Sequence, residues 1–136
     1  MCMFVCTAGG WNPSSSESQS GGVYESQEYL GQYMLLHFSN SEDVMENGIA
    51  DQSIFGQDFL SRSLQFPQRC AQKLVSTART LNIPCNRVLD VGCAVGGAVF
   101  EFAKENVDYA LGVDISASFI KTANQMKELG RVDYYR

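Results

Sequence analysis

Two aspartates and a group of glycines near the middle of the chain have the residue types and spacing of a ligand-binding loop. Asp90 precedes Gly92, Gly96 and Gly97, and Asp114 stands 22 residues after Gly92. Glycines between a strand and a helix let a ligand lie close to main-chain N–H groups. A carboxylate at this spacing is typical of one that accepts the hydroxyls of an adenosine ribose. The sequence therefore predicts a nucleotide-type site formed by Asp90, Gly92, Cys93, Ala94, Gly96 and Asp114.

Asp90 separates two ligands that such a loop could bind. A dinucleotide places a doubly charged pyrophosphate over the turn, where a carboxylate two residues before Gly92 would repel it. S-adenosylmethionine has no phosphate and presents an ammonium and a sulfonium, which a carboxylate attracts. The carboxylate therefore favours S-adenosylmethionine over a dinucleotide.

Other residues that could do chemistry have a structural interpretation that we prefer. Cys93 occupies an exposed loop position at a helix start, where a thiol can become a nucleophile, but His37 is the only histidine that could activate it. We therefore interpret Cys93 as a small residue lining the loop. His37 lies on the apolar face of its helix, which favours a buried, hydrogen-bonded histidine over a catalytic base. Tyr24, Tyr29 and Tyr33 are assigned to packing for the same reason.

The elements that must position these residues alternate between strands and helices. Apolar residues at helical spacing predict helices over 25–38 and from Pro67 to before Pro84, then over 97–105 and from Ser116 to Gly130. Short apolar runs predict a buried strand over 87–91, a second over 109–113 ending at Asp114, and the start of a third over 132–135.

This order predicts an α/β fold with a parallel sheet. A doubly wound sheet needs more strands than the two complete ones expected here, so we expect an incomplete Rossmann-like fold belonging to a longer protein. The Gly/Ser-rich residues 9–22 make 1–23 a flexible N-terminal segment, and 24–136 the N-terminal portion of the domain. We expect the 136 residues alone to be inactive.

Composition excludes several classes of protein. The chain has 45% hydrophobic and 18% charged residues with a formal net charge of −5, so it lacks the basic footprint for nucleic acid or an anionic membrane surface. No apolar run approaches the roughly 20 residues that span a bilayer, and Met1–Ala8 lacks the basic start of a signal peptide. Five cysteines without C-x-x-C spacing and a single histidine predict reduced thiols in a cytoplasmic protein and no metal site.

Two motifs resemble those of the class I S-adenosylmethionine-dependent methyltransferases: the run from Val88 to Gly97, and Gly112-Val113-Asp114-Ile115-Ser116. The chain is most similar to one branch, the methyltransferase domain of ovothiol biosynthesis, a family of 4-mercaptohistidine N1-methyltransferases. Further blocks carry this likeness, namely Tyr24-Glu25 with Tyr33-Met34-Leu35-Leu36-His37-Phe38, Phe66-Pro67-Gln68-Arg69-Cys70, and Phe119-Ile120 with Ala123-Asn124. The likeness runs from Tyr24 to Arg136 and covers the N-terminal half of such a domain.

The resemblance implies a role for each loop residue. Asp90 and the backbone from Gly92 to Gly96 would hold the methionine part of S-adenosylmethionine, Asp114 the ribose, and Ile115 the adenine. It also implies methyl transfer to an imidazole nitrogen of a mercaptohistidine-type small molecule. An imidazole lone pair needs no general base, so no catalytic residue is assigned. Gly97 departs from the arginine expected in this branch, which puts any contact of that arginine in doubt.

Two other functions stay open at this point. The chain could be a non-catalytic or truncated module that binds the cofactor without transferring a methyl group, or half of an NAD-dependent oxidoreductase. The sequence does not indicate an oligomeric state.

Overall fold

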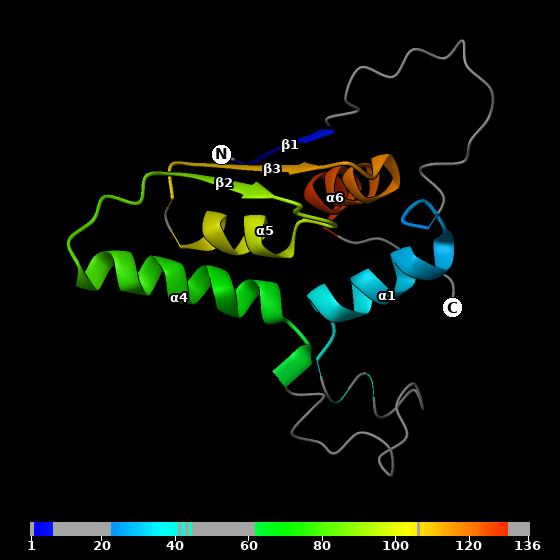
Figure 1. Cartoon of the computed structure of the whole chain (residues 1–136), viewed down its shortest axis with the longest axis horizontal. Helices are drawn as coiled ribbons and strands as arrows, with labels where there is room; N and C mark the ends of the chain where they lie inside the picture. Colours follow the sequence, from blue (N-terminus) through cyan, green and yellow to red (C-terminus); the bar gives the residue numbers. More distant parts are fainter. Residues whose placement is uncertain are drawn as a thin grey trace.

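The computed structural model describes residues 2–6, 23–40, 42, 44, 62–105 and 107–130. These residues form a mixed α/β structure with a parallel sheet and helices α1 (Gln27–Phe38), α4 (Phe66–Thr80), α5 (Gly97–Lys104) and α6 (Ala117–Leu129) (Figure 1). The predicted linker over 9–22 and the predicted strand over 132–135 lie outside the described residues.

The sheet has the strand order β1-β3-β2. Strands β2 (Arg87–Val91) and β3 (Tyr109–Asp114) are parallel, with Val88 opposite Ala110 and Asp90 opposite Gly112. Both predicted strands and the helix between them are confirmed. Because the two strands are parallel and adjacent, their carboxyl ends meet at one edge of the sheet, where the predicted site residues lie.

Strand β1 (Cys2–Cys6) was not expected from the sequence. It pairs in parallel with β3, with Cys2 opposite Ala110 and Cys6 opposite Asp114. Residues 1–23 are therefore not uniformly an irregular segment. The sequence signal was ambiguous because an apolar run of five residues also suits a helix or a targeting segment, and its pairing partner lies more than 100 residues away.

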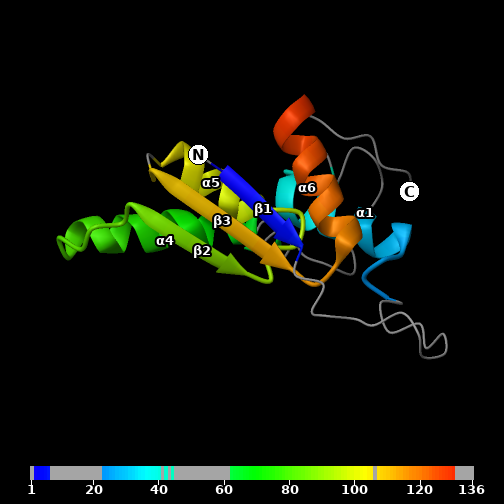
Figure 2. The same ribbon diagram turned by 90° about the horizontal axis from the view of Figure 1, so that it is seen from above.

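Helices cover one face of the sheet. Figure 2 looks onto the strands from above, with α5 and α4 behind them. On the covered face Ala110 is 1% exposed, whereas Leu89 and Val91 on the other face of β2 are 59% and 76% exposed. The prediction that 87–91 is a buried strand is therefore wrong: exposed residues alternate with half-buried ones along β2, because its side chains point to opposite faces and the helices cover one of them.

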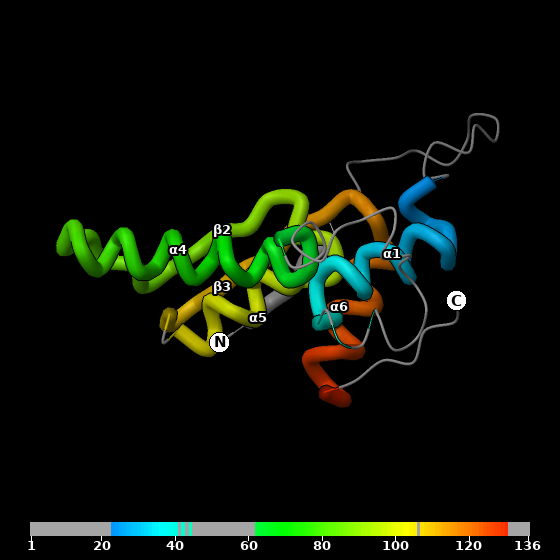
Figure 3. The backbone as a smooth tube through the Cα atoms, turned by 90° about the horizontal axis from the view of Figure 1, so that it is seen from below, coloured from blue at the N-terminus to red at the C-terminus, as the bar shows by residue number. Residues whose placement is uncertain are grey.

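Two apolar clusters join the helices to the sheet. The larger one lies between α4, α5, α6 and the covered sheet face, and its buried members are Ala71, Val75, Cys93, Val99, Phe102, Val107, Ala110, Ile120 and Ala123. The second holds α1 against α6 and the loop after β2, through Leu30, Met34, Ala94, Val95 and Phe119. Figure 3 shows α1 and α6 lying next to each other beyond the ends of the strands. The second cluster thus brings the N-terminal helix to the carboxyl ends of the strands.

The helix boundaries follow local rules. Ser26 and Ser116 are N-caps, and the Ser116 Oγ accepts a hydrogen bond from the Phe119 N–H at 3.2 Å. Pro67 lies in the first turn of α4, and Gly130 ends α6 in a left-handed conformation with φ 71°. The predicted helices over 25–38, 67–83, 97–105 and 116–130 are therefore confirmed to within a few residues.

Polar contacts fasten α4 to α5. The Gln72 amide donates to Glu101 Oε1 at 2.7 Å, and Lys104 Nζ lies 3.0 Å from Glu101 Oε2. Burial acts to raise the pKa of Glu101, but these partners outweigh it and hold the pKa below its usual value. Arg79 pairs with Glu105 at 2.9 Å. These contacts fix the helix that follows the glycine loop.

Gly112 provides a test of this packing. A Cβ at residue 112 would lie 2.8 Å from Cys93 Sγ and 2.9 Å from Val99 Cγ2. We expect Gly112→Ala to reduce the free energy of unfolding by about 1–3 kcal/mol through overpacking. Combining it with Cys93→Ala, which removes the Sγ, should cost less than the sum of the two single changes. Denaturant unfolding of the four proteins measures this coupling, and strictly additive effects would contradict the contact.

Candidate functional site

The loop after β2 turns sharply before it enters α5. Gly92 and Gly96 have φ of 79° and 85°, which glycine adopts without strain, and Ala94 has φ 46°. The N–H groups of Gly92 and Cys93 both donate to the Val113 carbonyl, at 2.8 and 3.0 Å. The glycines are therefore required by the backbone path, and the loop is fastened to β3.

Asp114 connects the loop to the start of α6. Its Oδ2 accepts from the Ala94 N–H and its Oδ1 from the Ser116 N–H, each at 2.8 Å. A carboxylate oxygen has two lone pairs, so both oxygens can accept a further hydrogen bond. The structure thus brings two of the predicted site residues, Ala94 and Asp114, into direct contact, and gives Asp114 a structural role that the sequence did not reveal.

Asp90 lies near Asp114 at the carboxyl end of β2. Burial raises the pKa of Asp90, and the charge of Asp114 raises it further. A carboxylate whose ionised form is disfavoured by burial and by a neighbouring negative charge gains from a cation placed beside it. The electrostatics at this edge of the sheet therefore favour a positively charged ligand over an anionic one.

The side chain of Cys93 does not face the loop opening. It is 2% exposed and packs against Gly112. Burial, followed by the charges of Asp90 and Asp114, raises the pKa of the Cys93 thiol to about 12. The expectation of an exposed loop position is wrong, because residue 112 lacks a side chain and the thiol fills that space. Cys93 can contribute only its backbone to a ligand, and its thiol is neutral at physiological pH.

The other loop residues differ in their exposure. Gly92 and Ile115 are exposed, with the Ile115 side chain 79% exposed beside Asp114, while Ala94 and Gly96 are buried. An exposed apolar side chain next to a hydrogen-bonding carboxylate is available to the flat face of a base. The contact of Ile115 with adenine stays a prediction.

Tyr33 of α1 packs against the second apolar cluster, which confirms the packing predicted from the sequence. Its ring lies 4.6 Å from that of Phe119 and 6.4 Å from that of Tyr24, measured between centroids. Burial raises the pKa of Tyr33, and the nearby Tyr24 and Asp114 raise it further. The phenol is therefore within electrostatic range of Asp114. Its i, i+4 spacing with Tyr29 is the signal from which this packing could be predicted.

Glu25 fixes the segment before α1 to the N-terminus of α6. Its carboxylate accepts from the N–H groups of Ala117 and Ser118 at 2.9 and 3.0 Å. Burial acts to raise the pKa of Glu25, but hydrogen bonds from Ser116, Ser118 and Ala117 lower it below its usual value. The hydroxyls of Ser116 and Ser118 also donate to the Tyr24 carbonyl, each at 3.1 Å. Nothing in the local sequence pattern signals this contact across the chain.

His37 fixes the other end of α1 to the start of α5. Its Nδ1 accepts a hydrogen bond from the Gly97 N–H at 3.1 Å, and burial lowers the pKa of His37 to about 4. This confirms a buried, hydrogen-bonded histidine. A Cβ at residue 97 would lie 2.5 Å from Nδ1. The position of His37 therefore requires glycine at residue 97. The resemblance leads one to expect arginine there.

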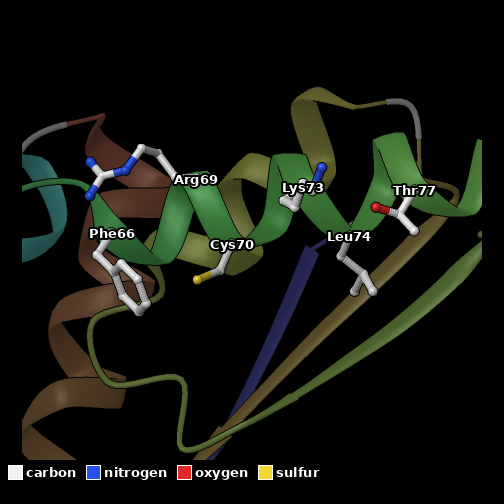
Figure 4. A pocket seen from close by; sticks show the side chains of 6 residues that line it. All are labelled: Phe66, Arg69, Cys70, Lys73, Leu74 and Thr77. Atoms are coloured by element: carbon white, nitrogen blue, oxygen red, sulfur yellow. The ribbon is translucent and has the colours of Figure 1, made fainter. Parts of the chain in front are cut away.

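A shallow groove runs along α4, away from the loop. It has a volume of about 500 Å³ and is lined by Phe66, Arg69, Cys70, Lys73, Leu74 and Thr77. Figure 4 shows Phe66, Cys70 and Leu74 pointing to the same side of the helix. No site residue predicted from the sequence lies in it.

Comparisons with family models, with curated proteins and with solved structures find no match. Within the part of the chain that the structure describes, no helix is long and apolar enough to cross a membrane. The same residues contain no group of three or more His, Cys, Asp or Glu side chains placed to hold a metal ion.

The buried His37 makes stability depend on pH. In the unfolded chain the imidazole takes up a proton near pH 6.5, whereas in the folded chain its pKa is about 4. Between these values the unfolded state binds more protons, so the free energy of unfolding should fall as the pH falls, by about 3 kcal/mol from this group. His37→Asn keeps an acceptor near the position of Nδ1 and does not titrate.

The measurement is urea unfolding of both proteins at several pH values from 7 to 4. The difference between the two profiles isolates His37 from the carboxylates, which titrate in both proteins. Parallel profiles would contradict a buried neutral imidazole.

Proposed function

We propose that this chain binds S-adenosylmethionine at the loop from Gly92 to Gly96, within a Rossmann-like class I methyltransferase fold. The observation that carries the proposal is the pair of carboxylates, Asp90 and Asp114, at the carboxyl ends of two adjacent parallel strands around that loop. Ligands of open α/β sheets bind at this edge. The ammonium and sulfonium of S-adenosylmethionine match the two negative charges, whereas a pyrophosphate would oppose them.

Each site residue has a role in this proposal. Asp90 attracts the positive charges of the methionine part, and the loop backbone lies against it. Asp114 is held by Ala94 and Ser116 and has lone pairs left for the two ribose hydroxyls. Ile115 offers its exposed side chain to the adenine.

The proposed reaction is methyl transfer to an imidazole nitrogen of a mercaptohistidine-type small molecule, as a step of ovothiol biosynthesis carried out by a longer protein. S-adenosylmethionine supplies an electrophilic methyl group when bound. The contribution of the chain is alignment, because in-line displacement depends on holding the reacting groups in position. The neutral imidazole acceptor needs no base, and the Cys93 thiol, with its pKa at about 12, supplies none.

Cofactor choice tests the proposal directly. We expect calorimetric titration of the chain to detect binding of S-adenosylmethionine and of its demethylated product. We expect it to detect no binding of NAD. Asp90→Asn should weaken the binding of S-adenosylmethionine more than tenfold, since it removes the negative charge that attracts the ammonium and sulfonium of the ligand. Asp108→Asn, the same change just before the amino end of β3, is the matched control and should leave the affinity unchanged. Tight NAD binding would instead support the oxidoreductase alternative.

The Asp114 carboxylate can be tested separately. Asp114→Asn should weaken the binding of S-adenosylmethionine more than tenfold. The single oxygen of an amide cannot accept hydrogen bonds from two backbone N–H groups and two ribose hydroxyls at once. Asp114→Asn should also lower the melting temperature of the ligand-free chain, because it weakens the hydrogen bonds of residue 114 with Ala94 and Ser116. Asp90→Asn should not lower this melting temperature. An unchanged dissociation constant in a folded Asp114→Asn protein would contradict the ribose role. Methyl transfer to a mercaptohistidine acceptor by the parent protein separates an enzyme from a non-catalytic binding module.

A further inference from the structure

A second cavity lies between the end of α1 and the beginning of α4, apart from the glycine loop. It has a volume of about 330 Å³ and is lined by Leu36, His37, Arg62, Ser63, Phe66 and Pro67. This size lies within the usual range for sites of small organic ligands. None of these residues belongs to the loop or to the two carboxylates, so the cavity is separate from the proposed cofactor site.

The His37 imidazole presents a hydrogen-bond donor on the side of this cavity. Nδ1 accepts from the Gly97 N–H, so the proton of the neutral ring is on Nε2. The edge of the ring that carries Nδ1, Cγ and Cβ faces Gly97, which leaves the Nε2 edge on the opposite side. A nitrogen sealed inside the protein without a partner would be a buried, unpartnered polar atom. Among the described residues the one such side-chain atom is Gln68 Oε1, so Nε2 of His37 is not sealed inside the protein.

The walls of the cavity are held in place by hydrogen bonds to backbone carbonyls. The Gln65 N–H donates to the Leu36 carbonyl at 2.7 Å, and the Gln68 amide donates to the His37 carbonyl. The Arg69 guanidinium donates to the carbonyls of Arg62 and Leu64. The end of α1 and the residues before α4 are thus joined before any ligand arrives, which reduces the entropic cost of binding.

The lining selects one ligand chemistry. Arg62 carries the only formal charge among the six lining residues, and its planar guanidinium suits a planar carboxylate. The Nε2–H of His37 adds a neutral donor, and Leu36, Phe66 and Pro67 provide an apolar wall. We infer that this cavity binds a small organic carboxylate, with the carboxylate toward Arg62 and His37 and the carbon body against the apolar wall.

The test uses the fact that His37 is the only histidine in the chain. In a chain labelled with 15N-histidine, the imidazole signals of the free protein should show the Nε2–H form. Adding benzoate at constant pH should shift these signals in a saturable way. Benzamide, which has the same shape and no charge, should bind at least tenfold more weakly. A free imidazole carrying its proton on Nδ1, or no saturable shift with benzoate, would overturn the inference.

Variants identify the groups responsible. Arg62→Gln should weaken the binding of benzoate at least tenfold. The control is Arg87→Gln, which alters an arginine lying over the Tyr109 ring and should leave the binding of benzoate unchanged. Equal binding of benzoate and benzamide would show an apolar hollow only. A response to inorganic phosphate equal to that with benzoate would show attraction by charge alone, and either result overturns the carboxylate assignment. Because the readout is His37 itself, the result does not depend on whether the loop binds S-adenosylmethionine.

Discussion

The carboxylate of Asp114 is the interaction on which the geometry of the site depends. It accepts one hydrogen bond from the loop, at Ala94, and one from the start of α6, at Ser116. Charge-assisted hydrogen bonds of this kind are stronger than neutral ones, and they satisfy N–H groups at two turns that would otherwise need water. The strand end, the loop and the following helix are therefore held as one unit, and the left-handed conformation of Ala94 is retained within it.

The N-terminal helix completes this unit from the other side. His37 at its end accepts the first N–H of α5, and Glu25 before its start accepts N–H groups of α6. Two helix N-termini that a ligand could otherwise approach are thus occupied by side chains of the chain itself. The surface left for the proposed ligand consists of the loop backbone with Asp90, the outer lone pairs of Asp114, and the exposed Ile115.

Much of the fold could be predicted because its signals are local. Ser116 and Gly130 mark the ends of a helix by capping chemistry, and Arg87–Val91 reads as a strand from its β-branched run. The features that were missed depend on residues far apart in the sequence. Strand β1 needs the free edge of β3, and the inward direction of Cys93 needs the absence of a side chain at Gly112. The contact of His37 with Gly97 likewise exists only after α1 has docked.

The hydrogen bonds of Glu25 also have a consequence for the order of folding. They join residues 92 and 93 positions apart, whereas β2, α5 and β3 together span fewer than 30 residues. Closing a long chain segment costs more entropy than closing a short one, and contacts of large sequence separation form slowly. We therefore expect β2, α5 and β3 to assemble early and α1 to dock late. The candidate site would then reach its final shape only after β2, α5 and β3 have assembled.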